Sequence, residues 1–144
     1  MDEKGLQLLY IDGMGAGRRG LADLLQSFGQ FRLIEAGNVP AALRLVSHQP
    51  VDLVLLGGCA RNDRAQENER VIRALGRWAP VVALVDGQYE RAEAWAIEAG
   101  ADDCLDATQL DSSQLLHTIR AAVIRRRRQA DRRDSARAGA AAAD

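Results

Sequence analysis

The sequence predicts an α/β protein built on a doubly wound, five-stranded parallel sheet. Its most informative stretch is 51–59, a short and almost uninterrupted apolar run in which valine and leucine alternate until Gly57 and Gly58 stop it. Such a run is typical of a strand that is covered on both faces, as the central strand of a parallel sheet is. Four more apolar runs alternate with helical patterns, and parallel neighbours need helical crossovers.

The order of these runs gives the expected elements. Short apolar runs predict strands at 6–11, 31–35, 51–57, 81–85 and 104–105. Apolar residues at helical spacing predict helices at 21–28, 39–49, 71–78, 89–99 and from 112 onward. Asn38 is a candidate N-cap, and Gly29 and Gly100 stand where helices should stop.

Length and charge predict one domain with a basic extension. Residues 1–124 suffice for one core, and 125–144 read as a basic helical extension or linker. The chain has a net charge of −1, yet the part from Arg120 onward carries eight arginines and three aspartates. The run Arg125–Arg128 could contact phosphate, but no nearby side chain could read bases, which favours a solvated linker helix. A heptad continued from the last helix places arginines at core positions, so a self-sufficient coiled coil is not expected.

Several classes of function lack support in the composition. Cys59 and Cys104 fit no disulfide framework and no metal-ligand spacing, and His48 and His117 each stand alone in helical stretches. No apolar stretch is long enough to span a membrane, and the first residues lack the pattern of a signal peptide, so we expect a cytoplasmic protein. No catalytic constellation is visible. We therefore expect neither an enzyme nor a bound metal or cofactor.

A glycine-rich turn keeps a nucleotide-binding alternative open. Gly15, Gly17 and Gly20 match the spacing G-x-G-x-x-G after the first predicted strand, and Glu35 stands twenty residues beyond Gly15. The intervening segment Asp12-Gly13-Met14 weakens the match, as does the short chain. A small nucleotide- or cyclic-dinucleotide-binding domain that uses residues 13–20 remains the second hypothesis.

Three segments resemble the receiver domains of response regulators. Residues 100–105 (Gly-Ala-Asp-Asp-Cys-Leu) resemble a Gly-Ala-Asp-Asp-Tyr-Leu segment of that family, and 52–56 resemble the strand before its phosphoacceptor aspartate. Residues 8–12 are similar to its first strand and acidic residue. The resemblance covers roughly residues 5–128 and implies the strand order 2-1-3-4-5 of the flavodoxin-like fold. The last helix resembles receivers that continue into an output domain.

The resemblance also implies which residues occupy the family's functional positions. In order along the chain these are Asp12, Gly13, Gly57, Val85, Cys104 and Ala107. Only Asp12 keeps the family's residue type; Gly57 stands at the phosphoacceptor position and Gly13 at the second acid of the Mg²⁺ pair. We therefore expect a pseudo-receiver that phosphorylation does not switch. The alternative is an unorthodox phosphorelay receiver, rescued by Asp63 or Asp86.

The family pairs or docks through its fourth helix, fifth strand and fifth helix, which implies an interaction face for this chain. The candidate contacts are Trp95, Leu105, Leu116, Ile119 and Val123. Ala94 and Ile97 share one helical stripe, and Trp95 lies well off it. We expect a protein partner or a homodimer at this face, and an attached output domain. The sequence does not distinguish a cyclic-dinucleotide synthase or phosphodiesterase, a kinase or a DNA-binding output.

Overall fold

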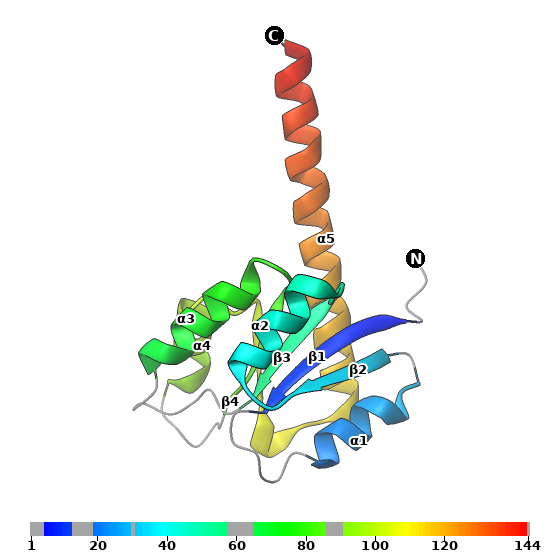
Figure 1. The fold of residues 1–144 in the computed structure, drawn as a ribbon, viewed down its shortest axis with the longest axis vertical. Coiled ribbons are helices and arrows are strands. Elements are labelled where there is room, and N and C mark those ends of the chain that lie inside the picture. Colours follow the sequence, from blue (N-terminus) through cyan, green and yellow to red (C-terminus); the bar gives the residue numbers. More distant parts are fainter. Residues whose placement is uncertain (1–4, 13–18, 30, 58–64, 86–90, 144) are drawn as a thin grey trace.

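Five parallel strands form one sheet in the order β2-β1-β3-β4-β5 (Figure 1). The computed structural model describes residues 5–12, 19–29, 31–57, 65–85 and 91–143. Its strands are β1 (Leu6–Asp12), β2 (Phe31–Ala36), β3 (Leu53–Gly57), β4 (Val81–Val85) and β5 (Asp103–Asp106). Its helices are α1 (Arg19–Ser27), α2 (Val39–His48), α3 (Ala65–Gly76), α4 (Ala92–Glu98), the 3-10 turn η2 (Ala107–Gln109) and α5 (Ser112–Ala143). The predicted fold class and strand order are confirmed.

β3 is the middle strand, as its apolar run predicts. All five of its residues are buried, and it pairs with β1 on one side and β4 on the other. Alternate residues of a strand point to opposite faces, so Val54 and Leu56 enter one core and Leu53 and Leu55 enter the other. Helices α2, α3 and α4 cover the first core, and α1 and α5 cover the second (Figure 1).

The helix boundaries follow local rules that the sequence shows. The side chain of Asn38 accepts a hydrogen bond from the backbone N–H of Ala41 at 2.8 Å, which caps α2. Gly29 follows α1 at φ 66°, and Gly100 follows α4 at φ 109°, a backbone conformation that favours glycine. Both predicted helix stops and the predicted N-cap are confirmed.

Two apolar residues lie elsewhere than their helical spacing predicts. Trp78 comes after the end of α3 and is 55% exposed, although it was expected on the inner side of that helix. In α4 the buried residues are Ala92 and Ala96, while Ile97 is 48% exposed. Small alanines let α4 lie close to the sheet, and this turns Ile97 outward and leaves Trp95 half-buried against the first core.

The last helix continues well past the sheet. α5 is one helix of 32 residues, and its second half projects from the end of the sheet at which the strands begin (Figure 1). The sequence predicted an extension beyond Ile124 with frayed last residues, whereas the helix runs to Ala143. Within the described ranges, no helix combines the length and the apolar character that a membrane span requires.

The arginine run anchors α5 to this end of the sheet. Three consecutive arginines meet three aspartates, with N–O distances of 3.6 Å for Arg125–Asp103, 4.0 Å for Arg126–Asp102 and 3.7 Å for Arg127–Asp52. A guanidinium N–H of Arg126 also donates to the carbonyl of Gly76. Partly exposed ion pairs contribute little individually. Together they fix the direction in which the helix leaves the sheet. The sequence suggested that these arginines are solvated, but the structure pairs them with aspartates.

Two of these aspartates also cap the sheet. Oδ2 of Asp102 accepts the backbone N–H of Val81 at 2.8 Å, and Oδ2 of Asp52 accepts that of Gln7 at 2.8 Å. A backbone donor that loses its acceptor on folding is costly. Each carboxylate therefore stabilises the beginning of a strand through this hydrogen bond, in addition to forming an ion pair.

The role of Asp102 is testable. Asp102→Ala removes the acceptor of the Val81 N–H and one ion pair, so the free energy of unfolding should fall by about 1–3 kcal/mol in urea titrations. Asp131→Ala is the control, because Asp131 is exposed on the projecting part of α5; its effect should stay within about 0.5 kcal/mol. Equal effects of the two substitutions would contradict the capping role.

Candidate functional site

The carboxyl ends of the strands bring most of the predicted site positions to one edge of the sheet. Asp12 at the end of β1 pairs with Gly57 at the end of β3, and Val85 at the end of β4 pairs with Asp106 of β5. Ligand sites of doubly wound sheets lie at this edge. Of the predicted positions, Gly13 and the side chain of Asp12 lie outside the described residues.

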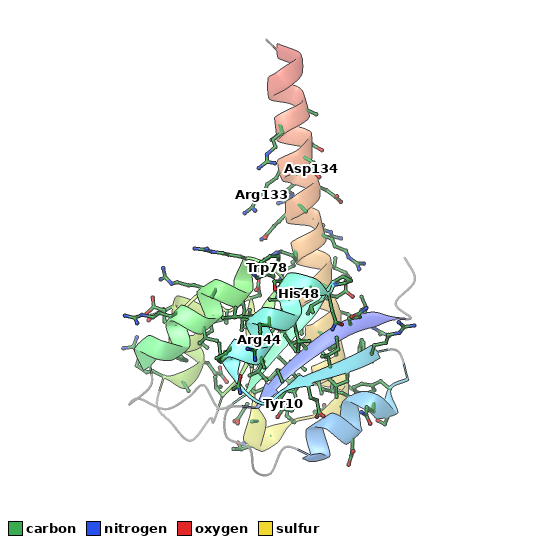
Figure 2. The ribbon with its side chains drawn as sticks, viewed as in Figure 1. Tyr10, Arg44, His48, Trp78, Arg133 and Asp134 are labelled. Carbon is green, nitrogen blue, oxygen red and sulfur yellow. The ribbon has the colours of Figure 1, made fainter. Side chains whose placement is uncertain are left out.

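Gly57 has room for a small side chain but offers no chemical group. A Cβ added there would lie 3.4 Å from the carbonyl oxygen of Ile11 and 3.6 Å from both Cε1 and the hydroxyl oxygen of Tyr10, which are ordinary contacts. Tyr10, which is 2% exposed and labelled in Figure 2, is thus the side chain nearest to the position that a Cβ of residue 57 would occupy. Backbone crowding therefore does not require a glycine at this position.

The other positions at this edge are apolar or unreactive. Val85 is fully buried in the first core, and it brings no hydroxyl to the edge. Ala107 begins the 3-10 turn directly after β5 and is partly buried against the second core. Neither side chain could hydrogen-bond or pair with a phosphoryl group.

Asp106 is a carboxylate at this edge that the sequence reasoning missed. Its Oδ1 accepts the backbone N–H of Thr108 at 2.9 Å and the Thr108 hydroxyl at 2.6 Å, which closes the turn after β5. The signal was the spacing of an aspartate and a threonine two residues apart at the end of a strand, which is typical of an Asx-turn. These bonds give the carboxylate a structural task.

The described residues do not fit a magnesium site. Among them, no three histidine, cysteine, aspartate or glutamate side chains come together in a way that could hold a metal. Protein Mg²⁺ sites need near-octahedral oxygen ligands, and the Asp106 oxygen at this edge already serves the Thr108 turn. Asp63 and Asp86, the residues of the rescue alternative, lie outside the described residues.

Cys104 is a half-buried thiol in β5. Its Sγ donates to the carbonyl of Glu93 across 4.0 Å, and the residue packs against the first core, as Trp95 does. Burial raises the pKa of the Cys104 thiol, and the negative charges of Glu93 and Asp103 add to this effect. The neutral thiol is a poor nucleophile, so Cys104 acts as a packing residue here.

The predicted interaction face is narrower than the sequence suggested. Leu105, Ile119 and Val123 are 3%, 0% and 4% exposed and lie in the second core, so these three candidates require correction: they cannot be contacts on the surface. They face inward because α5 packs its apolar stripe onto β3 and β5. Leu116 and Trp95 are half-buried and remain candidates. Ile97, which was not among the predicted contacts, is an exposed apolar residue of α4.

The described residues add no observation in favour of nucleotide binding at the glycine-rich turn. Residues 13–18 lie outside the described ranges, and Gly20 stands in the first turn of α1. Glu35, the proposed ribose-binding acid, is exposed in the edge strand β2.

Cys59 is outside the described ranges as well. His48 and His117 are exposed on helices, as expected.

Comparison with known proteins places the fold. No protein-family model and no curated protein sequence matches the chain. Solved structures do match it. The receiver domain of the sensor histidine kinase PA1611 from Pseudomonas aeruginosa, which has a magnesium ion in its active-site cleft, aligns with a TM-score of 0.66 at 21% identity. That alignment covers 83% of this chain and 98% of the receiver domain. The fold is that of the receiver domains of two-component signalling proteins.

Two further structures show the range of the similarity. A CheY-like receiver domain from Methanospirillum hungatei aligns over 85% of this chain and 97% of its own length, with a TM-score of 0.65 at 14% identity. NtrX from Brucella abortus aligns over 89% of this chain but only 28% of its own length, with a TM-score of 0.71 at 18% identity. In NtrX the matching fold is therefore one part of a longer chain.

The Cys104 environment predicts a measurable pH dependence. In a Cys59→Ser background, iodoacetamide should modify native Cys104 more slowly than the same chain in urea, because thiolate is the reactive form. Since the native pKa is raised, the native rate should keep rising with pH after the unfolded rate has levelled off. Identical pH profiles in the two states would contradict the assigned environment.

Proposed function

We propose that this protein is a pseudo-receiver, a receiver-like regulatory domain that acts by protein–protein interaction without being switched by phosphorylation. The observation that carries this proposal is Gly57 at the carboxyl end of the buried central strand. Receiver domains carry their phosphoacceptor aspartate at that position, and glycine has no group that can accept a phosphoryl group. The domain is proposed to be regulatory and not an enzyme.

The remaining chemistry of the edge supports the same proposal. Phosphoryl transfer depends on cations and donors that stabilise charge on the transferred group. Here Gly13 replaces one acid, and Val85 and Ala107 supply neither a hydroxyl nor an ammonium group. The PA1611 receiver has a coordinated magnesium ion in its cleft. The described residues of this chain do not supply a comparable set of ligands.

The lost charges also favour one fixed conformation. Carboxylates crowded at one site repel each other unless a cation compensates. Gly13 and Gly57 stand where the family has acids, so they relieve that repulsion, and no charge-driven change between two conformations is expected. The domain would present its interaction face constitutively.

The projecting helix suggests how the domain is connected. We propose that residues 1–124 form the receiver-like body and that 125–144 are a basic helical link to an output domain. NtrX, in which this fold occupies a small part of a longer chain, offers a precedent. The three ion pairs at the base of the link hold the start of the link, in the middle of α5, against the body. We place this activity in the cytoplasm, as expected from the sequence.

The proposed contact surface is the face formed by α4, β5 and α5. Its elements carry the exposed apolar side chains of Ile97 on α4 and Ile124 on α5, and the half-buried side chains of Trp95 and Leu116. Apolar and aromatic residues that become fully desolvated dominate many protein interfaces. A homodimer or a protein partner at this face is the proposed mode of action.

Phosphorylation independence is tested with acetyl phosphate and Mg²⁺. The protein should form no acid-labile phosphoryl adduct under conditions in which an active receiver domain is fully labelled. A stoichiometric acid-labile adduct would contradict the proposal, and its loss in Asp63→Asn or Asp86→Asn would establish the unorthodox phosphorelay alternative.

The interaction face is tested with Ile97→Asp. A charge on the exposed side of α4 should raise the dissociation constant of self-association, measured by sedimentation equilibrium, by about tenfold or more. Ser47→Asp on α2 adds the same charge to an exposed helix position away from this face and should leave the constant unchanged. Far-UV circular dichroism should be the same for all three proteins. If both variants self-associate like the original protein, this face is not the dimer interface.

A further inference from the structure

A cavity of about 380 Å³ lies between the end of α3 and the projecting helix α5. Its lining residues are Gly76, Arg77, Arg126, Gln129, Ala130 and Arg133. The four residues from α5 are spaced at i, i+3, i+4 and i+7, so they form one face of that helix. The lining contains three guanidinium groups and one side-chain amide, and it contains no carboxylate.

The charge of this lining is only partly balanced. Arg126 is held by Asp102 at 4.0 Å and by the carbonyl of Gly76. Arg77 and Arg133 are exposed, and neither forms an ion pair within the described part of the chain (Figure 2 shows Arg133 on α5). Like charges gathered around one cavity raise its positive potential, which an anion would offset.

We propose that this cavity binds a small phosphate-bearing anion. Guanidinium groups match phosphate oxygens through paired N–H donors, and three of them converge here. The volume lies within the range of about 300–1,000 Å³ that is typical of small-molecule sites. The site is separate from the carboxyl edge of the sheet, and it depends on neither the phosphorylation nor the dimer proposal.

Free pyrophosphate and the diphosphate of a nucleotide share this chemistry. Trp78 adjoins Arg77 in the chain and is 55% exposed, close to where α5 leaves the body (Figure 2). An exposed indole ring can stack on a base. A nucleotide would therefore gain a second contact that pyrophosphate lacks.

Occupancy would also affect the projecting helix. Arg77 belongs to the body and Arg133 to the extension, so one anion that contacts both would hold the extension against α3. Binding would favour one orientation of the helix over others. Ligand concentration, in place of phosphorylation, would then act on the link to an output domain.

Isothermal titration of the full chain with pyrophosphate and with ADP tests the proposal. Both probes should bind, and Arg77→Ala and Arg133→Ala should each weaken binding by about tenfold or more. Arg128→Ala is the matched control, because Arg128 is also an exposed arginine and its position in the helical repeat places it on the opposite side of α5; it should change affinity by less than about twofold. No binding of either probe at millimolar concentration, or equal losses in all three variants, would overturn the proposal.

Two further measurements identify the ligand source and the mechanical effect. If Trp78→Ala weakens ADP binding but not pyrophosphate binding, the site is a nucleotide site; if it weakens neither, the site recognises phosphate alone. Bound pyrophosphate should also slow tryptic cleavage after Arg133 in the original protein but not in Arg77→Ala.

Titration with a DNA duplex tests the assignment from the other side. A duplex that binds more tightly than ADP, and equally well to Arg128→Ala and Arg133→Ala, would show a general nucleic-acid surface and overturn the assignment.

Discussion

The burial of β3 on both faces is the constraint on which the rest of the structure depends. A strand covered on both sides needs helices on both sides, and parallel pairing needs those helices as crossovers. This arrangement brings the carboxyl ends of β1, β3, β4 and β5 to one edge. The function of that edge then depends on the side chains present there. In this chain Gly57 stands at its centre.

Among the described residues, several polar interactions lie at the opposite edge of the sheet. Asp52 and Asp102 cap backbone donors at the beginning of the sheet and also meet arginines of α5. The helix that leaves the domain is therefore held at the edge farthest from the positions of receiver chemistry. α5 contributes both to the second core and to the projecting extension. In the proposed function it would therefore connect the proposed interaction face to an output domain.

Periodicity and capping rules predicted the strands, the ends of α1 and α4, the N-cap of α2 and the central position of β3. They did not predict that α3 begins at Ala65 or that α5 runs to Ala143. Spacing alone could not orient α4, since Ile97 and Trp95 are both apolar and the closely packed alanines decide which of them turns outward. Nor could spacing reveal that Leu105, Ile119 and Val123 are core residues, because the family's docking face and the helix's core face share one apolar stripe. A family resemblance names a face without saying which of its side chains reach the surface.

The aspartate partners of the arginine run could not be predicted from the sequence, for a different reason. Asp52 and Asp102 are fifty residues apart, and only the register of the sheet brings them to the same edge beside α5. The same applies to the α3–α5 cavity, which needs the carbonyl of Gly76 to meet Arg126. The predicted site residues, in contrast, lie at strand ends, where the order of the elements suffices to place them.

The central claim is that a receiver scaffold has kept its shape and lost its phosphoryl switch. The most direct test is a two-dimensional amide NMR spectrum of the labelled protein before and after addition of beryllofluoride and Mg²⁺, which together mimic a bound phosphoryl group. The account predicts that the amide resonances of β4, α4 and β5 do not move. Saturable shifts in those elements, beginning at the carboxyl edge of the sheet, would contradict it.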